Sequence, residues 1–255
     1  MISLTWEGGQ VSSFDDMVAR MPDSVLASPR RSTIPLVDLC RVPDRAAELF
    51  AGIVGIPARW PCELAFEYEV PVQRGVGKPS CTDLMVLMPD AAVAVEAKRT
   101  EPEYESVRGW LAAGGSNRGE VLAGWLGLLS ASGTRPVAQA DVLDLPYQLI
   151  HRCASAAQLD RPQRAVVYLV FGEQVAAHYE QHMRALQQVV GTRADLKLVV
   201  ASCRMEPSDI VLKLEARWDA GERELAKDVR AGLLRGPLFS FAKPRQIYAG
   251  GVHAL

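Results

Sequence analysis

The sequence predicts a single α/β domain, a central mixed β-sheet flanked by helices. Apolar runs of strand length recur at 63–72, 84–88, 91–95, 164–172 and 196–202, and segments with helical spacing of apolar residues lie between them. Along the chain the order is a helix, three strands, several helices, a strand, a helix and two strands. This alternation is typical of a sheet covered by helices.

Composition limits the classes of function that fit the chain. Its 255 residues suit one elaborated domain, and with 49% hydrophobic and 23% charged residues a sizeable core is available. The formal net charge of −2 gives no global attraction to nucleic acid. Any binding of DNA or RNA must therefore use a local basic surface.

The cysteines and the apolar segments predict the compartment. Five cysteines are scattered without a C-x-x-C pair, which favours a reducing compartment without a disulfide framework or structural zinc. The first ten residues carry no secretory signal pattern, and the most apolar helical segment, 121–129, is too short to span a bilayer. We expect a cytoplasmic protein that does not bind membranes.

Residues 1–43 are predicted to be an irregular N-terminal extension, with a short helix after Ser13, and residues 44–255 the main domain. A helix of about ten residues begins at Pro43-Asp44, with Asp44 as a plausible N-cap and an apolar stripe at helical spacing. Glu48 lies off that stripe, where an exposed glutamate is ordinary.

The segment 63–72, ELAFEYEVPV, alternates between apolar and mostly acidic residues, which predicts a half-buried strand. Glu67 is central among its three acids, and it is either an extra metal ligand or simply exposed to solvent. The loop that follows contains GVGKPS, which lacks the spacing and the Ser or Thr of a Walker phosphate loop. As a basic, glycine-rich loop it places Arg74 and Lys78 where a phosphate backbone would be contacted.

The most informative stretch is 80–98, SCTDLMVLMPDAAVAVEAK. Two apolar runs flank Pro89-Asp90, which predicts a β-hairpin. A turn centred there, or a symmetric four-residue loop, places Asp83 opposite Glu96, with Cβ atoms roughly 5 Å apart. A loop with an odd number of residues would break this pairing. Side chains alternate along a strand, so Glu96 and Lys98 share a face. Two carboxylates this close repel unless a cation lies between them, and Mg²⁺ or Mn²⁺ suits such oxygen ligands.

The rest of the chain completes the sheet and its cover. Helices are predicted at about 102–113, 117–131, 144–158, 174–190 and 220–234, and further strands at 164–172, 196–202 and 209–216. Gln148 and Arg152 are four residues apart and share a helix face, where they either reach a substrate phosphate or form a polar outer face. His178 and His182 match no zinc-protease pattern.

Asp83, twelve intervening residues and then Glu96-Ala97-Lys98 resemble the active-site signature of the PD-(D/E)XK nuclease superfamily, although Thr82 stands where its proline would be. The resemblance implies a restriction-endonuclease-like fold over 44–255. It also implies that Asp83 and Glu96 bind Mg²⁺ or Mn²⁺ and that Lys98 positions or activates the attacking water. An accessory acid often lies on the first helix of that fold, which makes Glu48 a further metal candidate beside Glu67.

Two functions follow as expectations. The first is metal-dependent hydrolysis of phosphodiester bonds in nucleic acid, with DNA ranked before RNA and with a homodimer as one option for assembly. The second is a non-catalytic nuclease-fold domain used for binding nucleic acid or protein, since fold does not imply function. The near-neutral charge favours the second function, and the intact Asp83, Glu96 and Lys98 favour the first.

Overall fold

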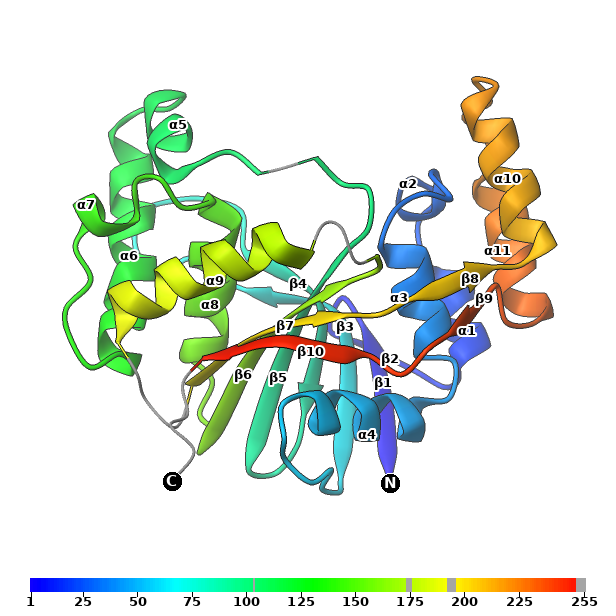
Figure 1. The fold of residues 1–255 in the computed structure, drawn as a ribbon, viewed down its shortest axis with the longest axis horizontal. Coiled ribbons are helices and arrows are strands. Elements are labelled where there is room, and N and C mark those ends of the chain that lie inside the picture. Colours follow the sequence, from blue (N-terminus) through cyan, green and yellow to red (C-terminus); the bar gives the residue numbers. More distant parts are fainter. Residues whose placement is uncertain (103, 173–175, 192–195, 251–255) are drawn as a thin grey trace.

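An eight-stranded mixed sheet forms the centre of the protein in the computed structural model, which describes residues 1–102, 104–172, 176–191 and 196–250 (Figure 1). The strand order is β10-β7-β6-β5-β4-β3-β1-β2. The prediction of a single α/β domain with flanking helices is confirmed. The strands are β1 (Ile2–Trp6), β2 (Gly9–Val11), β3 (Cys62–Val70), β4 (Ser80–Leu87), β5 (Ala91–Lys98), β6 (Gln163–Val170), β7 (Leu196–Ser202) and β10 (Arg245–Gly250).

Helices cover both faces of this sheet and bury two separate apolar cores. One core lies under the helices α1 to α4, α10 and α11, and the other lies under α5 to α9. The first group is α1 (Phe14–Arg20), α2 (Asp23–Leu26), α3 (Thr33–Leu39), α4 (Pro43–Ile53), α10 (Asp209–Asp219) and α11 (Ala226–Arg235). The second group is α5 (Val107–Ala112), α6 (Ser116–Ser132), α7 (Gln139–Val142), α8 (Tyr147–Ala157) and α9 (Ala176–Val190).

The predicted hairpin and its register are confirmed. β4 and β5 are antiparallel, with Leu84 opposite Val95 and Leu87 opposite Ala92. The N–H of Met88 donates to the carbonyl of Ala91 across the Pro89-Asp90 turn at 2.8 Å. β5 then runs parallel to β6, and β6 runs parallel to β7. The carboxyl ends of these three parallel strands therefore lie at the same edge of the sheet, where β5 ends at Lys98.

The prediction of an irregular segment over residues 1–43 is wrong. β1 pairs in parallel with β3 and antiparallel with β2, and α1 to α3 pack into the core. Beyond β1, the N–H of Glu7 donates to the carbonyl of Phe66 at 3.1 Å. The short helix after Ser13 is confirmed, since the Ser13 hydroxyl accepts from the N–H of Asp16 and caps α1. The first 43 residues therefore belong to the same folded unit as the rest.

The C-terminal part also differs from the prediction. Residues 209–216 were expected to form a strand but lie in α10, because Val211 and Leu214 form a helical stripe that is buried while Leu212 is 51% exposed. The helix expected at 220–234 begins only at Ala226. A two-stranded sheet joins β8 (Met205–Pro207) to β9 (Phe239–Phe241), and β10 follows within the expected tail.

The remaining helices and strands match the predictions with shifted ends. α6 and β7 lie where they were expected, and α5 begins later, at Val107. The predicted start of the helix at residue 174 lies outside the described residues. None of the described helices is long and apolar enough to cross a membrane.

Candidate functional site

The carboxyl end of β5 places Glu96 and Lys98 on the face covered by α8. Ala94 lies in the core beneath α5 to α9 and Ala97 in the opposite core, so the alternation of side chains directs Glu96 and Lys98 toward α8. Both side chains are deeply buried, each residue being only 2% exposed. Charged groups this deep require partners, and α8 supplies them.

Three hydrogen bonds join the Glu96 carboxylate and the Lys98 ammonium to α8, and a fourth joins the two side chains to each other. Oε1 of Glu96 accepts from Nζ of Lys98 and from Nε2 of Gln148, both at 2.7 Å, and Nζ of Lys98 also donates to Oε1 of Gln148 at 2.8 Å. Nε of Arg152 donates to Oε2 of Glu96 at 2.6 Å. Since lysine only donates and a carboxylate only accepts, both bonds fix the orientation of the Gln148 amide.

The Lys98 ammonium is held between two aromatic rings. Nζ lies 4.4 Å from the centroid of the Tyr104 ring and 5.9 Å from that of Tyr168. Burial alone would lower the pKa of Lys98, but Glu96 and Asp83 outweigh it and hold the pKa above its ordinary value. Lys98 is therefore a cation at neutral pH, a donor rather than a base.

Asp83 extends the charged cluster onto β4. It lies one position beyond the Leu84–Val95 pair, and its Oδ2 accepts from the backbone N–H of Ala97 at 2.8 Å. Its other oxygen forms no hydrogen bond with the described residues. Burial first, and then repulsion from Glu96, raise the pKa of Asp83 well above its usual range. For Glu96 the balance is opposite, because Arg152 and Lys98 lower its pKa despite burial.

Glu67 approaches the same cluster from β3. The register places it opposite Asp83, between the pairs Phe66–Leu84 and Tyr68–Thr82. Its φ is +50°, a left-handed conformation that is costly for a residue with a side chain and that gathers at functional sites. The Cys81 thiol donates to Oε2 of Glu67 at 2.9 Å, and burial raises the pKa of Glu67.

Protein groups alone supply only part of the coordination shell of a divalent cation. Within the described residues, no group of three His, Cys, Asp or Glu side chains forms a ready-made metal site. However, Mg²⁺ is commonly held by one or two carboxylates, with water and substrate oxygens completing its shell. Oδ1 of Asp83 and the second lone pair of Oε2 of Glu96 remain available. When Glu67, Asp83 and Glu96 are all ionised, their charges exceed those of Lys98 and Arg152 by one, which a bound cation would offset. The residues present therefore fit such an ion.

The structure does not bring every predicted site residue together. Glu48 is exposed on α4, whose apolar residues pack in the core on the opposite face of the sheet from Glu96. It is therefore removed from the cluster, contrary to the interpretation of Glu48 as a metal ligand. Arg74 is exposed in the β3–β4 loop and pairs with Glu120 at 2.7 Å. Lys78 lies in the same loop at a separate cavity.

Gln148 and Arg152 are part of the site, although not in the predicted role. Both were expected either to reach a substrate phosphate or to form an exposed face. Instead, both are buried, and their polar groups form hydrogen bonds with Glu96, Lys98 and Ser80. They hold the side chains of Glu96 and Lys98 in place. Their spacing of four residues was the correct signal for a shared face.

Sequence reasoning missed a second layer of polar groups behind Arg152. NH1 of Arg152 donates to the Ser80 hydroxyl at 2.9 Å, and that hydroxyl lies 2.8 Å from Nδ1 of His151. Burial and the Arg152 charge lower the pKa of His151 to about 3, so the imidazole is neutral. Tyr168, opposite Glu96 on β6, is buried with a hydroxyl that has no hydrogen-bond partner among the described residues. Nothing local in the sequence marks these contacts between separate elements.

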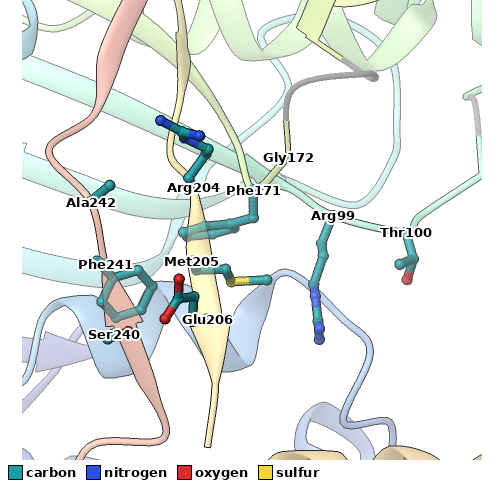
Figure 2. A pocket seen from close by; sticks show the side chains of 10 residues that line it. All are labelled: Arg99, Thr100, Phe171, Gly172, Arg204, Met205, Glu206, Ser240, Phe241 and Ala242. Atoms are coloured by element: carbon teal, nitrogen blue, oxygen red, sulfur yellow. The ribbon is translucent and has the colours of Figure 1, made fainter.

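A large groove opens at the same edge of the sheet, just past Lys98. It has a volume of about 820 Å³ and lies between the ends of β5 and β6 and the β8–β9 sheet. Figure 2 shows Arg99 and Thr100 on one side and Arg204, Glu206 and Phe241 on the other. The Arg99 guanidinium already bonds to Glu215 and to the carbonyl of Pro29. Phe171, which lines the groove, belongs to the core on the opposite face of the sheet from Lys98, and Asp83, Glu96 and Lys98 do not line the groove.

Comparison with known proteins gives one match. A family model described as a domain of unknown function, DUF6946, matches residues 10–214, which span the hairpin, the charged cluster and most of both cores. No curated protein and no solved structure matches the chain. Because the match covers most of the sequence, the chain belongs to the DUF6946 family.

Proposed function

We propose that this protein is a metal-dependent nuclease of the PD-(D/E)XK type. The observation that carries the proposal is the convergence of Asp83, Glu96 and Lys98 at one end of the β4–β5 hairpin, with Gln148 and Arg152 fixing Glu96 and Lys98. An ordinary surface ion pair would be exposed and would need no such support. Burial with fixed geometry is typical of preorganised sites.

The arrangement of elements supports the same assignment. The core of the PD-(D/E)XK fold has the order helix, three strands, helix and strand. The same order is found here in α4, then β3, β4 and β5, then the helices α5 to α8, and then β6. β3, β4 and β5 are antiparallel neighbours, and β6 runs parallel to β5. The signature residues Asp83 and Glu96 then lie on the two central strands of this unit.

Each residue has a defined part in the proposed reaction. Asp83 and Glu96 would hold a Mg²⁺ or Mn²⁺ ion, which when bound polarises the scissile phosphate and lowers the pKa of a water molecule. Lys98, as an ammonium, donates hydrogen bonds and stabilises negative charge that develops on the phosphate oxygens. Its raised pKa argues against proton abstraction by Lys98 itself. Gln148 and Arg152 are positioning residues that act through Glu96 and Lys98.

The competing function is a non-catalytic domain that keeps this fold for binding. The observation that favours it is the enclosure of the site, since Glu96 and Lys98 are almost fully buried and Tyr104 covers the ammonium. Thermal unfolding with and without Mn²⁺ separates the two functions, because an ion that binds only the folded state raises the midpoint. A midpoint that does not move with Mn²⁺ favours the binding domain.

The decisive experiment replaces Lys98 with methionine. Lys98→Met keeps the length and apolar stem of the side chain but removes its charge and donors, so hydrolysis of a mixed panel of DNA and RNA in Mn²⁺ should fall by about 10²-fold or more. Lys197→Met is the matched control, because Lys197 is a half-buried strand lysine that bonds to the carbonyl of Val54 and lies on β7, two strands from the β5 strand of Glu96. Cleavage that persists undiminished in Lys98→Met would refute the mechanism.

A further inference from the structure

A second cavity lies on the other side of Ser80 from the charged cluster. It has a volume of about 430 Å³, within the range of small-molecule sites. Its walls come from the end of the β3–β4 loop and from α5, α6 and α8. The residues that matter below are Lys78, Trp110, Arg118, Tyr147 and His151.

The charge of this cavity is opposite to that of the whole chain. Lys78 and Arg118 line it, and none of its lining residues is a carboxylate, although the chain has a net charge of −2. Lys78 is exposed and forms no ion pair with the described residues. Arg118 donates to the carbonyl of Trp110 and pairs with no carboxylate in the part of the chain that the structure describes. The cavity therefore attracts an anion.

Aromatic rings form the adjoining wall. Trp110 and Tyr147 are stacked, with ring centroids 3.7 Å apart and planes within 8°. The Arg118 guanidinium lies 5.1 Å from the Trp110 centroid, and Trp125 donates to the Tyr147 hydroxyl at 3.2 Å. Cations beside aromatic rings are the usual elements of sites for unpaired nucleotides, where the cation meets the phosphate and the rings meet the base.

His151 adds a directed donor. Arg152 can only donate to the Ser80 hydroxyl, so the hydroxyl proton is free to be donated to Nδ1 of His151. The neutral imidazole then carries its own proton on Nε2. His151 also lines the cavity, so we expect this N–H to donate to an oxygen or ring nitrogen of a ligand.

The same contacts connect the cavity to the proposed active site. Ser80 lines the cavity and bonds to Arg152, and Arg152 bonds to Glu96. We propose that the cavity binds an unpaired nucleotide of a nucleic-acid strand whose adjoining phosphodiester reaches the Asp83–Glu96–Lys98 cluster. This inference rests on the proposed nuclease function and assigns it a single-stranded or frayed substrate.

The test measures binding without cleavage. A single-stranded DNA 12-mer with a 5′-phosphate and a 3′-fluorescein is titrated with protein in EDTA at low salt, and its fluorescence anisotropy is recorded. Wild type should bind this strand at least fivefold more tightly than a blunt duplex of the same sequence. Lys78→Glu should weaken strand binding by about tenfold, since it reverses a charge in the cavity. Lys213→Glu on α10 is the matched control. It should bind the strand as tightly as the wild-type protein does, apart from a small change due to net charge.

Each outcome supports or overturns the inference. Equal affinity of wild type and Lys78→Glu, or of strand and duplex, would overturn it. Free dAMP that binds as tightly as the 12-mer would also overturn it, because the ligand would then be a mononucleotide. The fate of the proposed function is read separately: strand binding without Mn²⁺-dependent cleavage would refute the nuclease, and cleavage that Lys78→Glu does not impair would refute the cavity assignment alone.

Discussion

Removing the charge of Asp83 should make the metal-free protein more stable. Asp83 is buried beside Glu96 and opposite Glu67, and its pKa is raised well above the usual range by burial and by the Glu96 charge. Asp83→Asn keeps a side-chain oxygen that can accept from the N–H of Ala97. The substitution therefore removes repulsion while it preserves the hydrogen bond.

The size of the effect follows from the register. Opposed residues have Cβ atoms about 5 Å apart, and two unit charges at that distance repel by roughly 3 kcal/mol at an effective dielectric constant of about 20. Lys98 and Arg152 offset part of this repulsion, since they lower the pKa of Asp83. We expect a net gain of about 1–2 kcal/mol, which in a domain of this size raises Tm by roughly 2–8 °C.

The pH dependence of the stability change caused by Asp83→Asn provides a separate check on its sign. A carboxyl whose folded pKa is raised costs stability above that pKa, and the cost disappears as pH falls below its unfolded value, about 3.9. The advantage of Asp83→Asn over wild type should therefore be full at alkaline pH and vanish near pH 4. Thermal unfolding in EDTA across this range measures it.

The controls separate this explanation from a general charge effect. Asp90→Asn removes an aspartate from the turn of the same hairpin, where it pairs with Arg59 at a largely exposed site, and should change stability by no more than about 0.5 kcal/mol. In Mn²⁺ the order should reverse, because wild type gains the binding energy of the ion. A lower Tm for Asp83→Asn than for wild type in EDTA at pH 8 would refute the reasoning.

Two further predictions concern buried polar contacts. Arg152→Met should lower the free energy of unfolding by about 3–5 kcal/mol, because it leaves the buried Glu96 carboxylate without one of its partners. In a Glu96→Gln background the same substitution should cost at least about 1 kcal/mol less. Additive costs in urea unfolding would show that the two side chains do not interact. Asp38→Ala should cost roughly 3 kcal/mol, because Oδ2 of Asp38 accepts from the buried N–H groups of Leu238 and Phe239. A loss below 1 kcal/mol by urea unfolding would contradict that account.

Local patterns predicted the parts of this molecule that local contacts determine. The β4–β5 register followed from two apolar runs of similar length around Pro89-Asp90, and it correctly placed Asp83 next to Glu96. The role of Arg152 could not be predicted in the same way, because its partner Glu96 is distant in sequence and only the packing of α8 on the sheet brings them together. Glu48 is exposed, as its place off the apolar stripe predicted, but a helical pattern does not reveal which face of the sheet the helix covers, and so the sequence left a metal role for Glu48 open.

The position of β1 has a consequence for how the protein folds. β1 precedes β3 in the sequence and pairs with it in parallel, although the helices α1 to α4 lie between the two strands (Figure 1). Parallel pairing across so long a connection closes slowly, because the loop entropy is lost before the strand contacts form. The backbone of Phe66, next to the strained Glu67, gains its partner Glu7 only at that step. Completion of the sheet beside Glu67 should therefore be a late folding event that depends on the pairing of β1 with β3.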